Sequence, residues 1–215
     1  MMNLILHGYW RSSCSWRVRI VLNFKGLSAE YVPVHLVRGG GEQYYAEQRR
    51  INPMAQVPTL VVDGRSISQS VAIMEFLEET FPEPAMLPRD PYQRAKVRQL
   101  VEIVNSGIQP LQNLSVLKRL NSEGWDSDRV QSWAADWIRK GLLAYQDEMD
   151  SVGAQYSAGD SITLADAALV PQLVNARRFN VEFEGLSRLV EVETRLMNHP
   201  AFASTRPELQ PDMEK

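Results

Sequence analysis

The sequence predicts an α/β domain followed by an all-α domain, and two observations lead to this prediction. Over roughly the first 80 residues, short apolar runs alternate with segments of helical periodicity, whereas from residue 92 onward apolar residues recur almost entirely at helical spacing. Pro82 and Pro84 separate the two patterns, and proline cannot continue a helix. We therefore expect an α/β domain at 1–81, a linker at 82–91 and a helical domain at 92–215.

The first three elements form a β-α-β pattern. Leu4–Leu6 is a short apolar run and so a candidate strand, after which Val18, Val21 and Leu22 recur at the spacing of one helix face. Tyr31–Leu36 is a second strand candidate. Because a helix lies between the two strands, we expect them to pair in parallel through a right-handed crossover.

A hairpin and a helix complete the first domain. Thr59–Val62 and Ser66–Ser68 flank Asp63-Gly64, a dipeptide that accepts the positive φ angles of a tight hairpin turn. An amphipathic helix then starts at Ser70. The resulting order, β-α-β-α-β-β-α, is that of a thioredoxin-like domain with a mixed four-stranded sheet.

The second domain is expected to be a bundle of helices. Strand patterns almost vanish after residue 92, and Thr163 and Asp166 have the spacing of an N-terminal capping box, with Asp in place of the usual Glu. We expect the Trp133 and Trp137 pair, four residues apart, to lie in the core. The other periodic apolar positions are Val97, Leu100, Val101, Val104 and Leu143.

Charge and cysteine content narrow the class of function. A net charge of −3 gives the chain no broad positive field, which favours a small ligand over nucleic acid. Cys14 is the only cysteine, and the chain begins without a basic segment leading into a long apolar one, so a cytoplasmic protein is expected. No stretch reaches the roughly 20 apolar residues of a membrane helix. The histidines share no metal-ligand spacing, so no metal is expected.

The segment between the first strand and the first helix is the first candidate ligand site. Ser12, Ser13 and Ser15 lie where a helix begins, and the free N–H groups and dipole of a helix N-terminus stabilise an anion. Serine hydroxyls there can donate hydrogen bonds to a thiolate or a carboxylate. The same serines can equally serve only as helix caps, and local sequence does not separate the two interpretations.

Two further segments are candidate ligand sites, and each also has a purely structural interpretation. Pro58 immediately precedes a strand, and a cis Val57-Pro58 bond would turn the backbone of Val57 outward to pair with an extended peptide ligand. The alternative is an ordinary proline at a strand entrance. Gln69 and Ser70 lie at the entrance to the third helix, where they could hold a carboxylate or merely cap the helix.

Two motifs resemble those of one enzyme class. Ser12-Ser13-Cys14-Ser15-Trp16-Arg17-Val18-Arg19 closely resembles the active-site signature of the zeta-class glutathione transferases, and the segment from Ile108 to Leu117 resembles its counterpart in their helical domain. The resemblance covers the full chain. It implies the glutathione transferase fold, a homodimer, glutathione as cofactor, and isomerisation of maleylacetoacetate in the breakdown of tyrosine and phenylalanine.

The resemblance also implies roles for individual residues. Ser12, Ser13 and Cys14 would line the thiol site as the catalytic group. Gln43, Val57 with Pro58, Gln69 and Ser70 would hold the rest of glutathione, and Gln109, Asn113 and Ser115 would face the same cleft. The substrate, a small dicarboxylic keto acid, would meet Arg178, with Arg11 and Arg17 as the other candidates, because guanidinium suits bidentate recognition of carboxylates.

The implied reaction is addition of the glutathione thiolate to the cis double bond, rotation, and elimination to the trans isomer, which regenerates glutathione. Glutathione transferase activity is expected as a side reaction. Three alternatives remain open: maleylpyruvate isomerisation in gentisate-type degradation, a monothiol oxidoreductase with Cys14 as nucleophile, and a glutathione-fold binding protein without chemistry.

Overall fold

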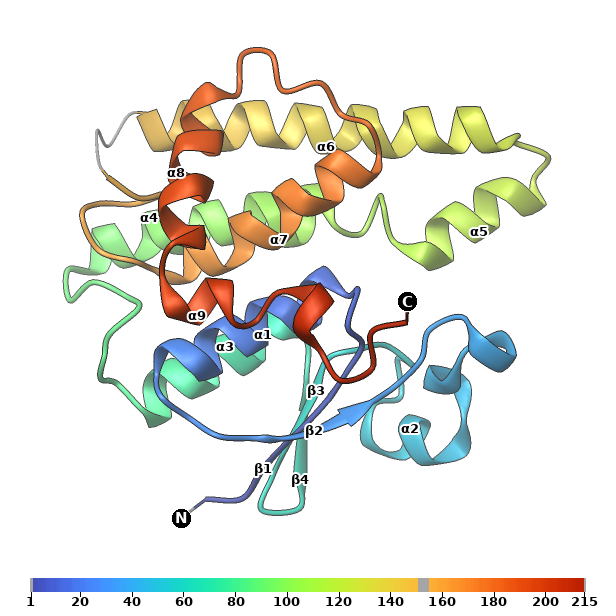
Figure 1. Cartoon of the computed structure of the whole chain (residues 1–215), viewed down its shortest axis with the longest axis horizontal. Coiled ribbons are helices and arrows are strands. Elements are labelled where there is room, and N and C mark those ends of the chain that lie inside the picture. The colour runs from blue at the N-terminus through green and yellow to red at the C-terminus, as the bar shows by residue number, and fades with distance from the viewer. Residues whose placement is uncertain (1, 151–154, 215) are drawn as a thin grey trace. The chain divides into compact units, whose positions relative to one another are not determined.

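The computed structural model describes residues 2–150 and 155–214. The chain divides into two compact units (Figure 1). The first comprises Met1–Ala85 together with Met197–Lys215, and the second comprises Met86–Leu196.

A mixed four-stranded sheet forms the centre of the first unit. Its strands are β1 (Leu4–Gly8), β2 (Glu30–Pro33), β3 (Thr59–Val62) and β4 (Arg65–Ser68), in the order β2-β1-β3-β4. β1 pairs with β2 in parallel and with β3 antiparallel, and β3 pairs antiparallel with β4. This confirms the predicted thioredoxin-like arrangement. β2 ends at Pro33, short of the expected Leu36.

The hairpin between β3 and β4 forms as its sequence predicts. Asp63 has φ 47° and Gly64 has φ 81°. Positive φ at both central residues gives a two-residue turn whose twist matches that of the flanking strands. Glycine is needed at position 64 because few other residues adopt this conformation at low cost.

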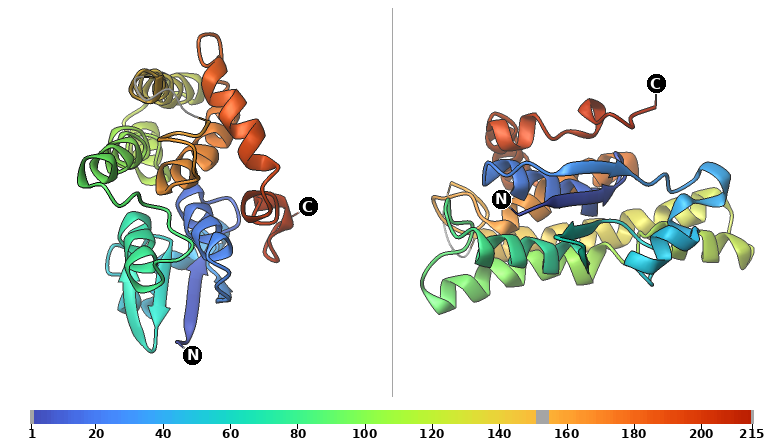
Figure 2. Two further views of the ribbon diagram at one scale, coloured as in Figure 1. Left: turned by 90° about the vertical axis from the view of Figure 1, so that its left-hand side faces the viewer. Right: turned by 90° about the horizontal axis from the view of Figure 1, so that it is seen from below.

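Two helices of the first unit, α1 (Ser13–Phe24) and α3 (Ser70–Thr80), lie side by side in the views of Figures 1 and 2. Each buries an apolar face completely, including Val18 and Ile20 on α1 and Ile73 and Met74 on α3, all with 0% exposure. This burial is the main source of their stability, because short helices are marginal in isolation. The remaining helical segments between β2 and β3 are the 3₁₀ turns Arg38–Gly40 and Glu42–Tyr44 and helix α2 (Ala46–Ile51).

The C-terminal tail belongs to the first unit, whereas the sequence placed it in the helical domain. The tail contains α9 (Pro200–Ala203) and a 3₁₀ turn, Pro207–Leu209. Its contacts explain the difference: Trp16 Nε1 on α1 donates to Thr205 Oγ1 at 3.0 Å, and Phe202 is fully buried. These contacts join segments almost 190 residues apart, which periodicity along the chain does not reveal.

The second unit consists of helices. They are α4 (Pro91–Glu102), a π-helical segment (Ile103–Ile108), α5 (Leu114–Ser122), α6 (Ser127–Asp150), α7 (Leu164–Arg178) and α8 (Ser187–Met197). The predicted capping box starts α7: both the backbone N–H and the hydroxyl of Thr163 donate to Asp166 Oδ2, at 2.7 and 3.0 Å. Asp166 is fully buried, and burial raises the pKa of its carboxyl group.

The long helix α6 buries a different face from the one expected. Its buried stripe is Val130, Ala134, Ile138, Leu142, Tyr145 and Met149. Trp133 and Trp137 lie beside this stripe and are only half-buried, packing edge to face with ring centroids 5.7 Å apart. The core prediction for this pair was therefore wrong in part, because the smaller side chains take the inward positions.

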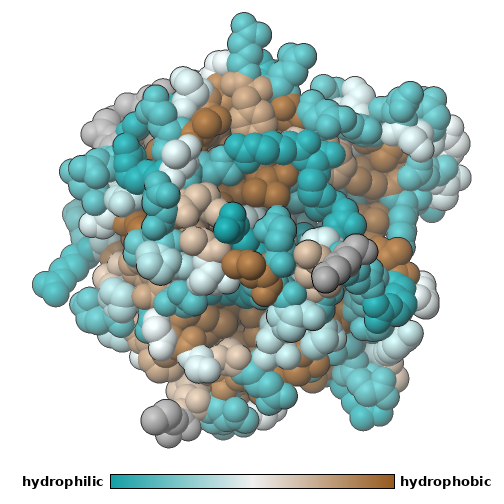
Figure 3. All heavy atoms as spheres, viewed as in Figure 1, coloured by the Kyte–Doolittle hydropathy of each residue, from teal (hydrophilic) through white to brown (hydrophobic). Residues whose placement is uncertain are grey.

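On the face drawn in Figure 3, hydrophilic side chains are dispersed among smaller apolar areas. In the described part of the chain, none of the helices has the length and apolarity that a bilayer-spanning segment requires.

Candidate functional site

Strand directions place four of the predicted ligand segments at one edge of the sheet. His7 of β1, Thr59 of β3 and Ser68 of β4 lie in register. β1, β2 and β4 run in the same direction, so their carboxyl ends and the start of β3 share this edge. The segments that follow or precede them therefore converge there: residues 9–14, 34–45, 57–58 and 69–70.

The first segment starts helix α1. Ser12 is the N-cap residue, and its Oγ accepts a hydrogen bond from the Ser15 N–H at 3.1 Å. Ser13 and Cys14 occupy the first turn, where backbone N–H groups have no intrahelical acceptor. No acidic residue lies in this turn. The positive end of the helix dipole is therefore not neutralised by a side chain and can stabilise a bound anion such as a thiolate.

Helix α3 starts in a similar way. Ser70 is buried at its first position, and Gln69 precedes it with φ 74° and an exposed side chain. A non-glycine residue in this left-handed region is strained, and such strain is concentrated at functional positions. The first turn of α3 also lacks acidic residues, so it can hold a carboxylate.

Arg17 lies behind this second helix start. It is fully buried on α1, and its Nη1 donates to Ser70 Oγ at 3.2 Å. The sequence offered Arg17 as a candidate contact of the substrate. A guanidinium with no exposed surface does not meet a ligand directly, so its position favours a supporting role, in which it orients the Ser70 hydroxyl.

Two residues at the sheet edge, Val57 and Gln43, have polar groups without a hydrogen-bond partner among residues 2–150 and 155–214. The Val57-Pro58 bond is cis, and no hydrogen bond among the described residues engages the Val57 backbone N–H or carbonyl. Gln43 is buried, and its Oε1 has no partner within the described part of the chain, although its Nε2 donates to the Leu36 carbonyl. A bound peptide would satisfy both groups, and glutathione is such a peptide.

Apart from Arg178, the predicted residues of the second unit follow its π-helical segment, and such segments are frequent at functional sites. Gln109 is half-buried directly after it. Asn113 caps α5: its Oδ1 accepts from the Ser115 N–H at 3.0 Å and from the Ser115 hydroxyl at 2.8 Å. Asn113 and Ser115 therefore have a structural role, and their binding role stays a prediction.

The two remaining arginine candidates are exposed. Arg178 lies at the last position of α7, where its Nη1 donates to Asn175 Oδ1 at 3.1 Å. Arg11 lies in the segment before α1, with its guanidinium carbon 5.4 Å from the centre of the Trp10 ring. Both are accessible to a carboxylate, unlike Arg17. Arg177, which precedes Arg178 in the chain, is instead paired with Glu193, with Nη1 2.7 Å from Oε1.

Sequence reasoning missed two residues near the thiol segment. Arg19 is buried, and its guanidinium donates to the carbonyls of Tyr9, Trp10 and Thr205 at 3.4, 3.2 and 3.4 Å. Burial lowers its pKa to about 10. Asp212 accepts a hydrogen bond from the Trp10 N–H at 3.0 Å. No local signal identifies Asp212, because 202 residues separate it from Trp10.

Comparisons with known proteins agree with this arrangement. Residues 6–85 match the family model described as glutathione S-transferase, N-terminal domain. A probable maleylacetoacetate isomerase of Drosophila melanogaster is 46% identical over 97% of this chain and 89% of its own length. The crystal structure of maleylacetoacetate isomerase from Anaeromyxobacter dehalogenans, with glutathione bound in its active site, has a TM-score of 0.88 at 45% identity and covers 99% of both chains. A bacterial zeta-class maleylpyruvate isomerase has a TM-score of 0.93 at 38% identity, covering 97% of this chain and 99% of its own.

Proposed function

We propose a function from one premise: the chain belongs to the maleylacetoacetate isomerase family, the zeta class of the glutathione transferases. It is a glutathione-dependent cis–trans isomerase. Glutathione is its cofactor, and glutathione is bound in the active site of the relative's crystal structure. We propose maleylacetoacetate as its substrate, with fumarylacetoacetate as the product and tyrosine and phenylalanine breakdown as the pathway.

The observation that carries this proposal is the convergence of four segments at one sheet edge. Two of them are helix starts without acidic residues, which suit a thiolate and a carboxylate. The other two offer the unengaged backbone of Val57 and the buried Oε1 of Gln43. Together these groups match the thiol, the peptide backbone and the terminal carboxylate of an extended tripeptide.

The chain's residues have distinct roles in the proposed reaction. Bound glutathione supplies the thiolate that adds to the cis double bond and leaves after rotation. Ser12, Ser13 and the N–H groups of the first turn of α1 keep the thiol ionised, because they stabilise negative charge at its sulfur. Ser70, oriented by Arg17, binds a glutathione carboxylate. Arg178 binds the dianionic keto acid and offsets the charge that grows as the thiolate adds.

A second substrate is supported by a specific observation. One of the most similar structures is a maleylpyruvate isomerase, and its TM-score of 0.93 exceeds that of the maleylacetoacetate isomerase at 0.88. Both substrates are dicarboxylic keto acids with a cis double bond. The residues proposed for catalysis serve either one, so fold similarity does not separate them.

We further propose that the protein is a cytoplasmic homodimer. Large apolar side chains are exposed between β2 and β3, including Val37 (57%) and Met54 (64%). Exposed apolar groups of this kind are a common feature of subunit interfaces. Light scattering at micromolar concentration tests the dimer, and an isomerase with the mass of a monomer contradicts it.

Turnover of each candidate substrate tests the proposed function. Purified protein is incubated with maleylacetoacetate, with and without glutathione, and the product is identified. We expect glutathione-dependent formation of fumarylacetoacetate with no net loss of glutathione, because the thiolate is regenerated. The same assay is repeated with maleylpyruvate.

Each outcome has a definite meaning. Turnover of maleylpyruvate alone moves the protein to gentisate-type degradation. Turnover of neither substrate contradicts the isomerase. The Cys14→Ala variant separates the isomerase from a monothiol oxidoreductase, because the isomerase keeps measurable turnover without this thiol whereas a cysteine nucleophile is indispensable.

A further inference from the structure

The C-terminal tail lies across the segment that leads into the thiol site. Both belong to the first unit, and Figure 1 shows the tail next to β2 and the start of α1. We propose that Asp212 is a positioning residue for the thiol site: it holds the Trp10 backbone and thereby fixes the turn from which α1 begins. This inference rests on the proposed function, because it assigns Asp212 to the same glutathione site.

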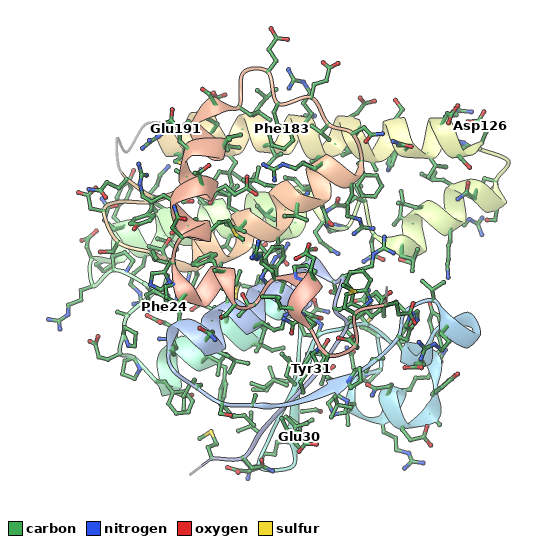
Figure 4. All side chains as sticks on the ribbon, viewed as in Figure 1. Phe24, Glu30, Tyr31, Asp126, Phe183 and Glu191 are labelled. Atoms are coloured by element: carbon green, nitrogen blue, oxygen red, sulfur yellow. The ribbon has the colours of Figure 1, made fainter. Side chains whose placement is uncertain are left out.

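Asp212 makes two hydrogen bonds with one carboxylate oxygen. Its Oδ2 accepts from the Trp10 N–H at 3.0 Å and from the Tyr31 hydroxyl at 3.2 Å. Tyr31, labelled in Figure 4, extends from β2 on the side of the tail. Oδ1 of Asp212 is also buried and has no partner within the described part of the chain. The residue as a whole is half-buried, and removing carboxylate oxygens from water costs free energy that these two hydrogen bonds offset.

Arg19 holds the same peptide units from the helix side. Its guanidinium donates to the carbonyls of Tyr9 and Trp10, at 3.4 and 3.2 Å, while Asp212 binds the N–H of Trp10. The Tyr9–Trp10 backbone thus has a fixed cation on one side and a fixed anion on the other. The charged group that faces Asp212 is the Arg19 guanidinium, and the neutral phenols of Tyr31 and Tyr9 are its other titratable neighbours.

Fixing the Tyr9–Trp10 backbone also fixes the residues of the thiol site. The Tyr9 carbonyl that Arg19 binds also accepts from the Ser12 N–H at 3.0 Å, which closes a turn. Ser12 then caps α1 and precedes Ser13 and Cys14. Only one residue, Arg11, lies between Trp10 and Ser12, so displacement of Trp10 moves the hydroxyls that are proposed to face the thiolate.

The tail also contacts residues 34–45, another of the segments that converge at the sheet edge. Glu214 Oε2 lies 3.3 Å from His35 Nε2, and Glu214 also pairs with Arg38. His35 Nδ1 in turn accepts from the N–H groups of Val37 and Arg38, at 3.1 and 2.7 Å. This segment leads to Gln43, so a single stretch of tail contacts two of the four segments that bear predicted glutathione contacts.

Three substitutions test the proposal. Asp212→Ala removes the acceptor, Asp212→Asn keeps an oxygen acceptor but removes the charge, and Glu208→Gln is a matched control on an exposed tail residue. Amide hydrogen exchange over residues 8–16 reports whether the hydrogen bond between the Trp10 N–H and Asp212 is present. Ultraviolet titration of the bound glutathione thiolate reports its pKa, and steady-state kinetics report KM for glutathione and kcat separately.

We expect Asp212→Ala to accelerate exchange at the Trp10 amide about tenfold and to raise KM for glutathione about three- to tenfold, the effect of one lost hydrogen bond. The pKa of the bound thiol should rise toward that of free glutathione, a change that general loss of stability does not produce. Asp212→Asn should keep amide exchange and thiol pKa close to their wild-type values, because its side-chain oxygen still accepts the hydrogen bond. Glu208→Gln should match the wild type. Unchanged exchange and unchanged thiol pKa in Asp212→Ala overturn the proposal.

Two further outcomes are distinguishable. If the wild type fails to isomerise either substrate, while Asp212→Ala still loosens the Trp10 amide and raises the thiol pKa, the isomerase proposal fails and the positioning role stands. If Asp212→Ala does not fold, Tyr31→Phe replaces it, because it removes only the second partner of Asp212. Tyr31→Phe should accelerate exchange at the Trp10 amide and raise the thiol pKa, as Asp212→Ala does. If neither quantity changes in Tyr31→Phe, the proposal is overturned.

Discussion

Ser12 and Ser13 are adjacent, but their hydroxyls are engaged differently. Ser12 Oγ already accepts the Ser15 N–H at 3.1 Å, so it stabilises α1 even without a ligand. Ser13 is 7% exposed, and no hydrogen bond within residues 2–150 and 155–214 uses its hydroxyl. A hydroxyl that the fold does not use is available to a thiolate. The sequence alone left both serines, and a purely capping interpretation, open.

We expect the two alanine variants to separate these roles. Ser12→Ala should lower the free energy of unfolding by about 1 kcal/mol, because the N-cap acceptor is lost. Ser13→Ala should leave stability unchanged and reduce kcat/KM about 100-fold, the usual effect of removing one donor to a developing or bound anion. Urea unfolding and steady-state kinetics on both variants measure these effects. Full activity in Ser13→Ala assigns the thiol contact to Ser12 or to the backbone.

At the residue scale, sequence reasoning works where a role depends on near neighbours. The cap at Ser12, the cis Val57-Pro58 bond and the capping box at Thr163 all follow from a few adjacent residues. It fails for Arg17, because burial of an arginine depends on what packs over it. Nothing near Arg17 in the chain reveals that Ser70 receives its hydrogen bond.

At the element scale, periodicity identified the helices of the second unit but not which face each one buries. On α6 the tryptophans suggested an inward stripe, yet the buried stripe begins at Val130 and runs through Ala134 and Ile138. The reason lies in the helix packed against it. The π-helical segment packs against α6, and at Gly141 it lies so close that no side chain fits at this position.

Gly141 provides a test of this close approach. A Cβ added there would lie 2.2 Å from Ile108 Cγ1, far inside van der Waals contact. We therefore expect Gly141→Ala to lower the free energy of unfolding by about 1–3 kcal/mol, as overpacking does. Gly107→Ala is the matched control, because a methyl group added at Gly107 would have nothing within 4 Å of it. Equal urea midpoints for the two variants would contradict tight packing between α6 and the π-helical segment.

At the scale of the whole molecule, the order of elements was predictable from the sequence, whereas the assignment of the tail was not. Strands, helices and the hairpin of the first 80 residues follow from alternation, helical spacing and one turn dipeptide. The return of residues 197–215 to the first unit depends on contacts such as Trp16 with Thr205. Those contacts have no counterpart in local pattern, because they join residues 189 positions apart in the chain.

The two units are proposed to bind different reactants, and this assignment leads to a prediction for the whole enzyme. Ser70 of the first unit is assigned to glutathione, and Arg178 of the second unit is assigned to the keto acid. Ser70→Ala should raise KM for glutathione about three- to tenfold and leave KM for the keto acid unchanged. Arg178→Gln should raise KM for the dianionic keto acid about tenfold or more and leave KM for glutathione unchanged, since a charge-assisted contact is lost.

Arg177→Gln is the control for Arg178→Gln, because it removes an adjacent positive charge of the same unit. Arg177 is paired with Glu193, which is 7% exposed, so this variant should lose stability and keep both KM values. Initial rates with each reactant varied in turn measure the two constants, and thermal unfolding measures stability. If Arg178→Gln and Arg177→Gln raise KM for the keto acid equally, the effect comes from general positive charge at the end of α7, and Arg178 is not a specific contact.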